Sequence, residues 1–434
     1  MDRWIDFQQT LTQRDLLSNL SQFPTKTIGL EGHALIRGVA GAGKSWQLGQ
    51  RSEMAMQSYE RILVLTYNRF MKAWLQSKIG EIREMSDRNP LGATVDCKTF
   101  HEWSRGLNYQ YEWDQDPALR KQMIGLAKWS GLNYQAIFVD EAQDFYDEWF
   151  QALLTVLDRR TQSLFFVYDN TQSIYGPWQG CQRPADWSWN KLGIEVRGRS
   201  QILDINYRNA PEILELAWQY LYPFLQSAGL KVERRTPDHT PALQSILEPK
   251  KCLDRSSQRS PGLIQVAAQE MPLQIARQVQ LALDSHPASS IGILTHPSLG
   301  RFRQAIAQAL QTAGIPHQAP QTSSDRQGNV VRRPWVIVDS WNALKGVEFD
   351  AVILVGIDLM LEDGEPDRLL QSAAGLYTAM TRARDHLVIL YDEQNATVER
   401  LQAAIASPGL LQAHEGSRDS SPPPQHPDTP ESQP

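Results

Sequence analysis

The segment GVAGAGKS, residues 38–45, constrains this chain more than any other part of the sequence. It fits G-x-x-x-x-G-K-[ST], in which glycines let the backbone close around phosphate groups while free amides point at the anion. It follows an apolar run at residues 33–37 and opens a helical pattern at 44–60, the strand–loop–helix context that the motif requires. The sequence therefore predicts a nucleotide-binding lobe, with Lys44 at the β- and γ-phosphates and Ser45 holding Mg²⁺. The predicted phosphate-binding residues are Gly38, Gly41, Gly43, Lys44 and Ser45.

Short apolar runs in two series predict two α/β lobes. The first series lies at residues 33–37, 62–66, 136–140 and 164–168, and the second at 262–267, 291–295, 335–339, 352–356 and 387–391. Such runs, rich in β-branched or aromatic residues, are typical of buried parallel strands, and helical patterns separate most of them. We therefore expect an α/β fold with lobes at residues 1–195 and 196–406, each built on a parallel sheet. Residues 237–261, rich in Ser, Pro, Arg and Lys, are predicted to be a surface excursion of the second lobe.

The net charge of the 434 residues is −6, so the chain lacks the overall basic character of many nucleic-acid-binding proteins. Residues 407–434 carry much of this acidity, are rich in proline and contain few apolar side chains, which predicts a disordered tail. Such a tail can dock a protein partner, although an inert solvated tail is the simpler interpretation. The rest of the chain is nearly neutral, which is compatible with a locally basic groove.

Other compositional features exclude several classes of protein. The three cysteines, Cys97, Cys181 and Cys252, lie far apart with no Cys-x-x-Cys pair, so neither a disulfide scaffold nor a zinc site is expected. No apolar run approaches the roughly 20 residues that span a bilayer. The first residues are polar and include acids, unlike a secretory signal. We expect a cytoplasmic protein that does not contact a membrane.

The segment IFVDEAQD, residues 137–144, places two carboxylates directly after an apolar run. Ligands of open α/β sheets bind at the carboxyl ends of the strands, so Asp140 and Glu141 should lie beside the glycine-rich loop. Asp140 would bind Mg²⁺, directly or through water, and Glu141 would orient and deprotonate the attacking water. An acidic turn alone would be weak evidence, but beside the glycine-rich loop it predicts hydrolysis of a nucleoside triphosphate.

Further motifs follow in an order that resembles the UvrD/Rep/PcrA-like branch of the superfamily 1 helicases. They are ILVLTYN at residues 62–68, TFH at 99–101, YDNTQSIYG at 168–176, NYR at 206–208, SWNALKGVEFD at 340–350 and LYTAMTRARD at 376–385. The resemblance spans most of the chain, from about residue 22 to residue 391. It implies two tandem RecA-like lobes with ATP and Mg²⁺ in the cleft between them.

The resemblance also implies roles for individual residues of the nucleotide site. Gln172 would sense the γ-phosphate and couple it to the nucleic-acid side. Arg208 and Arg382 would act as arginine fingers from the second lobe, because a planar guanidinium pairs with two phosphate oxygens at once. Tyr207 would stack on the adenine, and Glu348 would contact the ribose or help to link the lobes.

Two positions depart from the family pattern. The family has a glutamine upstream of the glycine-rich loop that reads adenine. Gln22 lies at a suitable distance, but the residues around it match poorly and Gln13 is an alternative. Relatives often place an arginine after Gly-Lys-Ser, where this chain has Trp46, which either stacks on the base or packs in the core.

Single strands are bound by aromatic faces that stack on bases and by polar groups that hold phosphates. By resemblance, the nucleic-acid contacts are Tyr67, Asn68, Thr99, Phe100 and His101 in the first lobe, with Tyr175 and Trp178 as the base-stacking platform. A Gly-Pro pair precedes Trp178, so its register relative to the family stays open. His101 has no acid or cysteine partner in the sequence, so we expect no metal there, and an ordinary polar contact is the alternative to a phosphate contact. Most of the 13 tryptophans, Trp187 and Trp189 among them, should pack in the core.

The spacing of the motifs leaves little room for the accessory domains that larger relatives insert in each lobe. The resemblance thus implies an ATP-dependent 3′-to-5′ DNA helicase or single-strand translocase reduced to two lobes, acting on single-stranded DNA or a tailed duplex. An alternative is an ATP-gated single-strand-binding clamp, or a motor subunit of a repair or defence complex that does not unwind alone.

Overall fold

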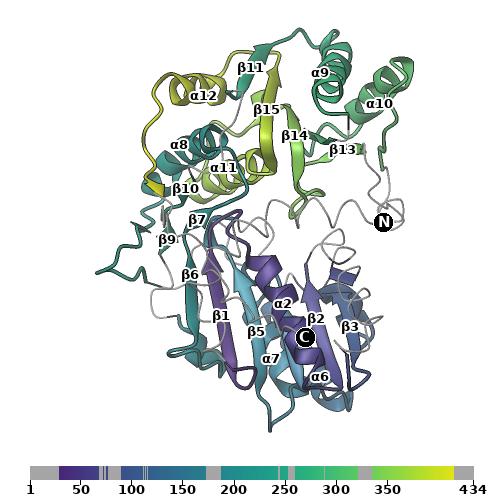
Figure 1. Ribbon diagram of the computed structural model, residues 1–434, viewed down its shortest axis with the longest axis vertical. Coiled ribbons are helices and arrows are strands. Elements are labelled where there is room, and N and C mark those ends of the chain that lie inside the picture. The colour runs from purple at the N-terminus through teal and green to yellow at the C-terminus, as the bar shows by residue number, and fades with distance from the viewer. Residues whose placement is uncertain are drawn as a thin grey trace, which may run out of the picture.

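The computed structural model describes residues 29–67, 72, 75–76, 89–110, 112, 114, 116–172, 187–242, 245–252, 260–287, 289–320 and 335–414. These residues form two α/β lobes, one above the other in Figure 1, with the earlier part of the chain below and the later part above. The predicted α/β class with two parallel sheets is confirmed.

The first lobe is built on a six-stranded parallel sheet with the strand order β3-β2-β4-β5-β1-β6. Its strands are β1 (His33–Gly38), β2 (Arg61–Thr66), β3 (Thr94–Thr99), β4 (Ala136–Val139), β5 (Ser163–Tyr168) and β6 (Ser200–Leu203). Its helices are α2 (Lys44–Met56), α4 (Phe100–Arg105), α5 (Pro117–Arg120), α6 (Gln122–Trp129) and α7 (Asp147–Val156). Along β2, Val64 packs on the face that α2 covers, whereas Leu63 and Leu65 pack on the face of α4, α6 and α7. The sheet is therefore buried on both sides, as its continuous apolar runs predict.

The second lobe has a five-stranded parallel sheet with the order β11-β15-β14-β12-β13. Its strands are β11 (Gly262–Gln265), β12 (Ser290–Thr295), β13 (Trp335–Ser340), β14 (Phe349–Val355) and β15 (Ala383–Tyr391). Its helices are α8 (Pro211–Ser227), α9 (Met271–Ser285), α10 (Phe302–Thr312), α11 (Pro366–Met380) and α12 (Ala396–Ala406). Ile293 of β12 packs with α9 and α10, and its neighbour Leu294 packs with α8 and α11 on the other face.

The junction between the lobes differs from the sequence prediction. β6 pairs with β1, so the first sheet continues past residue 195, where we expected the first lobe to end. Short strands follow: β7 (Ile205–Asn206), β10 (Lys250–Cys252) and β16 (Ala413–His414) form one parallel sheet, and β8 (Val232–Glu233) pairs with β9 (Ile246–Leu247).

Residues 245–252 are not the surface excursion that their composition suggests. Leu247 packs in the first-lobe core beside α2, and its neighbour Ile246 packs in the second-lobe core. Arg37, buried in β1, donates hydrogen bonds to Ala242 O and to Ser245 Oγ, the latter at 3.3 Å. The prediction for this segment is wrong because one apolar pair and one buried arginine outweigh the polar residues around them.

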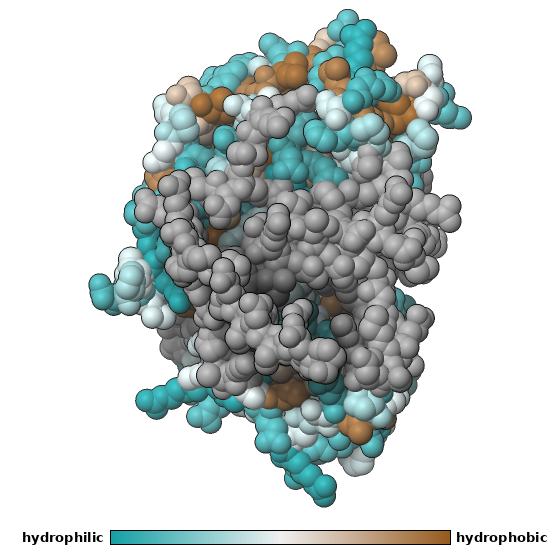
Figure 2. Space-filling model, viewed as in Figure 1, coloured by the Kyte–Doolittle hydropathy of each residue, from teal (hydrophilic) through white to brown (hydrophobic). Residues whose placement is uncertain are grey.

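The surface of the described residues is mixed. On the face shown in Figure 2, apolar residues gather in small patches among hydrophilic ones. Trp129, at the end of α6, is the most exposed large apolar side chain in the described part of the chain, with 88% of its surface accessible. Among the helices described, none is both long enough and apolar enough to cross a bilayer.

Candidate nucleotide site

Three strands of the first sheet end beside one another at the edge nearest the second lobe (Figure 1). Residues 38–45 follow β1, Asp140 follows β4 and Asp169 follows β5. Because β5 lies between β1 and β4, Asp169 is placed between the two predicted motifs. The structure thus brings the glycine-rich loop and the carboxylates together, with one further acid that the sequence analysis left without a role.

Glycine is required at two points of the loop. Gly41 and Gly43 have φ angles of 68° and 85°, in the left-handed region that side chains with a Cβ rarely adopt. A Cβ added to Gly41 would lie 2.6 Å from Cβ of Arg208 and 2.9 Å from Nδ2 of Asn206. The loop is therefore packed directly against the segment that carries NYR, and the absence of a side chain makes that approach possible.

We expect Gly41→Ala to lower the free energy of unfolding by about 1–3 kcal/mol, because it adds backbone strain and a clash at one position. Denaturant unfolding of both proteins measures this. Gly49→Ala in α2 is the matched control: an added Cβ there meets no atom within 4 Å, and alanine favours a helix by up to about 1 kcal/mol. Equal stability of Gly41→Ala and the wild type would contradict the packing described here.

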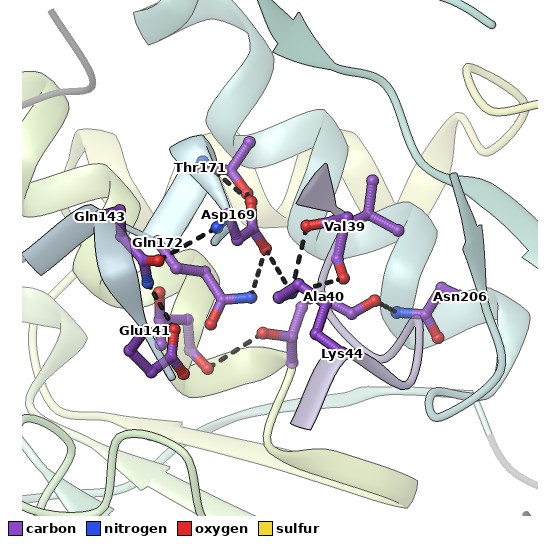
Figure 3. A network of polar contacts seen from close by, with 12 residues as sticks. Val39, Ala40, Lys44, Glu141, Gln143, Asp169, Thr171, Gln172 and Asn206 are labelled. Atoms are coloured by element: carbon purple, nitrogen blue, oxygen red, sulfur yellow. Dashed lines mark hydrogen bonds and ion pairs between the residues drawn. The ribbon is translucent and has the colours of Figure 1, made fainter. Parts of the chain in front are cut away.

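Lys44 is held inside the loop. Its Nζ donates to the carbonyl oxygens of Gly38 (3.1 Å) and Val39 (2.9 Å) and lies 3.4 Å from Asp169 Oδ2 (Figure 3). The ammonium is thus fixed by backbone oxygens and one carboxylate at the position where the motif predicts phosphate oxygens.

The predicted magnesium ligands lie within reach of each other. Ser45 Oγ donates to Asp140 Oδ1 at 3.3 Å. The other oxygen, Asp140 Oδ2, is buried and accepts no hydrogen bond from the described residues. Burial and the neighbouring charge of Glu141 raise the pKa of Asp140 well above its usual range. A hydroxyl and a carboxylate oxygen that lacks a partner are the hard oxygen donors that Mg²⁺ prefers, so these residues fit that ion.

Glu141 has a strained backbone, with a φ angle of 52°, and its side chain is buried. Gln143 donates through Nε2 to Glu141 Oε2, and its Oε1 accepts from the backbone N–H of Asp169 (3.1 Å), as Figure 3 shows. Burial alone would raise the pKa of Glu141, but the positive charges of Lys345 and Lys44 outweigh it and hold the pKa below its usual range. Glu141 is therefore an ionised carboxylate oriented by an amide.

Gln172 and Arg382 connect the two lobes. Gln172 Nε2 donates to Asp169 Oδ2 at 2.7 Å, and Gln172 Oε1 accepts from Arg382 Nη2 at 3.1 Å. The guanidinium also donates through Nε to Thr378 O at 3.0 Å and is buried. A chain of contacts thus runs from Lys44 through Asp169 and Gln172 to Arg382.

Arg208, Tyr207 and Glu348 lie on the second side of the site. Arg208 forms an ion pair with Glu348 and donates from Nη1 to Thr381 O at 3.4 Å. Burial opposes ionisation of Glu348, but Arg208 and Arg384 lower its pKa below the usual range. The half-buried Tyr207 donates its backbone N–H to Gly41 O at 3.1 Å, which places it against the glycine-rich loop.

The start of α4 differs from the predicted nucleic-acid track. Thr99 is the N-cap of α4: its Oγ1 accepts from the N–H of Glu102 (3.2 Å), whose carboxylate accepts in turn from the N–H of Thr99 (3.0 Å). Phe100 is fully buried and stacks on Trp149, with ring centroids 3.8 Å apart. Phe100 therefore covers the sheet and offers no face to nucleic acid, contrary to the prediction, whereas the predicted contact of Thr99 stays a prediction.

Tyr67 and His101 are half-buried and lie side by side, with ring centroids 5.5 Å apart. The acid partner that the sequence did not reveal for His101 is Asp114, whose Oδ2 lies 3.0 Å from Nε2. Tyr109 donates its hydroxyl to the other oxygen of Asp114 at 2.8 Å. This network orients the imidazole.

Several predictions remain without a structural answer. Gln22, its alternative Gln13, Asn68, Tyr175 and Trp178 lie outside the described residues, as do Cys181 and the tail beyond residue 414. Trp187 and Trp189 are buried in the core, which confirms that prediction.

Two further residues of the site, Asp144 and Lys345, had no predicted role. Asp144 is the last residue of DEAQD, and Lys345 lies in ALKGVEF of the second lobe. Their Oδ2 and Nζ atoms lie 2.5 Å apart, with side-chain exposures of 1% and 2%. Both residues fall inside motifs whose other residues already had a predicted role, and this was the feature of the sequence that could have indicated a role for them.

Comparison with known proteins gives each lobe a match. Residues 26–177 match a family model described as an AAA domain, and residues 190–394 match another with the same description. No curated protein matches the chain.

Two solved structures show distant likeness. The C-terminal domain of a possible DNA helicase from Lactobacillus plantarum is 15% identical, with a TM-score of 0.30 over 46% of this chain and 95% of that one. Arterivirus nonstructural protein 10, a helicase solved with DNA, is 11% identical, with a TM-score of 0.36 over 86% of this chain and 63% of that one. Both scores are low, so the fold assignment rests on the sheets and the two domain matches.

Proposed function

We propose that this chain, whose two AAA domains are of the superfamily 1 helicase type, is a UvrD-like, ATP-dependent 3′-to-5′ DNA helicase or single-strand DNA translocase. The observation that supports this best is the contact between Gln172 and Arg382. It joins the end of β5, beside the proposed magnesium residues, to the second lobe, so a change at the γ-phosphate would change how the lobes are held together.

The proposed chemistry uses residues that already lie at this edge. Lys44 would exchange its bonds to the carbonyls of Gly38 and Val39 for bonds to phosphate oxygens. Ser45 and Asp140 would hold Mg²⁺, which would neutralise phosphate charge when bound. Glu141, ionised and oriented by Gln143, would accept a proton from the attacking water.

The second lobe would complete the site. Arg382 would contribute positive charge at the γ-phosphate when the lobes close. Arg208, paired here with Glu348, would act beside it. Tyr207 would stack on the adenine. Nucleic acid would bind along the track that includes Tyr67 and His101, and the motif that carries Gln172 would communicate its presence.

Glu141→Gln tests this proposal. The change removes the base but keeps the size of the side chain, so we expect ATP turnover to fall by about 10²–10⁴-fold while nucleotide binding persists. ATP hydrolysis is measured with and without oligo-dT. Glu399→Gln is the matched control, because Glu399 is exposed on α12 of the second lobe and should leave turnover unchanged. Full activity of Glu141→Gln, or no stimulation of the wild type by oligo-dT, would overturn the proposal.

The direction of movement needs a separate assay. Unwinding of duplexes with a 3′ tail and with a 5′ tail should show activity on the 3′-tailed substrate alone. A preference for the 5′ tail would refute the proposed polarity. ATP-dependent binding of oligo-dT with no movement in a single-molecule translocation trace would favour the clamp hypothesis instead.

A further inference from the structure

Asn206 and Asn209, which have no role in the proposed chemistry, lie buried where the glycine-rich loop meets the second lobe. Their exposed fractions are 0% and 1%. A buried amide is stable only when its donors and acceptors find partners, so the partners show what holds each side chain in place.

Asn206 contacts the loop and the segment of Arg208 at the same time. Its Nδ2 donates to Ala40 O (2.8 Å, Figure 3) and to Asn209 Oδ1 (2.7 Å). Its Oδ1 accepts from the backbone N–H groups of Arg208 (3.0 Å) and Asn209 (2.8 Å). The amide can take only this orientation, because the opposite one would set its N–H groups against two backbone N–H groups.

Asn209 continues the network to the other arginine. Its Nδ2 donates to Thr381 O at 3.0 Å and to Ala383 O, the carbonyl groups on either side of Arg382. The next residue, Ala210, donates its backbone N–H to Arg384 O at 2.7 Å. The turn after β7 therefore runs along the backbone that carries Arg382.

We propose that Asn206 and Asn209 are positioning residues for ATP hydrolysis: as one amide pair, they fix the glycine-rich loop, Arg208 and Arg382 in a common frame. This inference rests on the proposed function. Neither amide needs to touch the nucleotide. Each acts through the backbone of the residues that do, so that the two arginines take fixed positions relative to the loop once the lobes are closed.

The pair also explains why a buried polar network is placed here instead of apolar packing. Apolar side chains would fill the space but would not select the position of Ala40 O, Thr381 O and Ala383 O, whereas hydrogen bonds are directional. A group displaced by about 1 Å in an active site can cost on the order of 10²-fold in rate, so directional placement of two arginines has a large effect.

Asn209→Asp and Asn206→Asp test the proposal first. Each keeps the shape of the side chain but sets an oxygen against the carbonyl oxygens that the amide now bonds. We expect kcat for ATP to fall by about tenfold to a hundredfold, with a smaller change in KM, because placement of the arginines is lost while the loop remains. Asn395→Asp at the N-cap of α12 is the matched control: its Oδ1 still accepts from the N–H of Val398, and kcat should stay at the wild-type value.

A buried aspartate can prevent folding, so alanine variants are tested as well. Asn209→Ala should lower kcat in the wild-type chain but change it by less than about twofold in an Arg382→Ala background, because the amide acts through that arginine. Single-turnover phosphate release measures this, and the melting temperature of each variant shows whether it is folded. Fully additive losses, or wild-type kcat in folded Asn206→Ala and Asn209→Ala, would overturn the proposal.

Amide hydrogen exchange gives a readout that does not depend on activity. In Asn206→Ala, the N–H groups of Arg208 and Asn209 lose their acceptor, so a peptide that covers them should exchange faster than in the wild type. Unchanged exchange would also overturn the proposal. Faster exchange in the variant, together with a wild type that hydrolyses no ATP, would instead contradict the proposed function. It would still support the contacts by which the two amides position their neighbours.

Discussion

ATP turnover is expected to fall by about 10³–10⁵-fold when Arg382 is replaced by alanine, the range typical for loss of an arginine finger. Arg382 is buried, donates to Gln172 and belongs to the second lobe, so it is the group that second-lobe closure would bring to a developing phosphate charge. Burial and the nearby Arg208 lower its pKa to about 10, which leaves it protonated at neutral pH. Steady-state and single-turnover hydrolysis measure the effect.

Arg382→Lys separates charge from geometry. A lysine keeps the positive charge but lacks the planar fork, so it should restore little of the lost activity. Arg400→Ala is the control, since Arg400 is exposed on α12 and lies over the ring of Phe224, away from the site. An Arg382→Ala protein that remains folded and turns over ATP within tenfold of the wild type would exclude a finger role.

Lys345→Met is expected to have the largest effect on stability, a loss of about 3–5 kcal/mol in the free energy of unfolding. The change leaves Asp144 as a buried carboxylate without its closest cation, and the two side chains are 1–2% exposed. It also removes one of the positive charges that hold the pKa of Glu141 down, so we expect lower turnover in the protein that remains folded. Denaturant unfolding and ATP hydrolysis are measured on the same preparations.

Two comparisons make this prediction specific. Removing both charges, with Asp144→Leu added to Lys345→Met, should recover much of the lost stability, because an apolar pair carries no desolvation cost. Lys98→Met is the control, since Lys98 pairs with Asp96 on the surface at 3.8 Å and such a pair contributes about 0–1 kcal/mol. A loss for Lys345→Met no larger than that for Lys98→Met would contradict a stabilising role of the buried pair.

The first-lobe site was predictable because its residues follow strands. Asp140 comes directly after β4 and the loop directly after β1, and the carboxyl ends of parallel strands meet at one edge whatever their order. Asp169 follows β5 in the same way, but its place between the two motifs depends on the strand order, which the sequence does not state. That order is why it contacts Lys44, whereas its bond to Gln172, three residues further on, is local.

The nucleic-acid side was less predictable. A motif identifies a segment but does not say which of its side chains faces outward, and the helical turn of α4 buries Phe100 while His101 stays half-exposed. The partner of His101, Asp114, lies in a segment with no motif, so no sequence pattern predicted this contact.

The sequence by itself determined the two parallel-sheet lobes and the chemistry of the loop and the two carboxylates, because strand periodicity and loop composition are local properties of the chain. Tertiary structure alone decided which residues meet across the lobes. Lys345 reaches Asp144 from 201 positions away, and Asn206 reaches Ala40 from 166. Such pairs are set by how the two lobes pack against each other, and nothing in the local pattern around either residue encodes its partner.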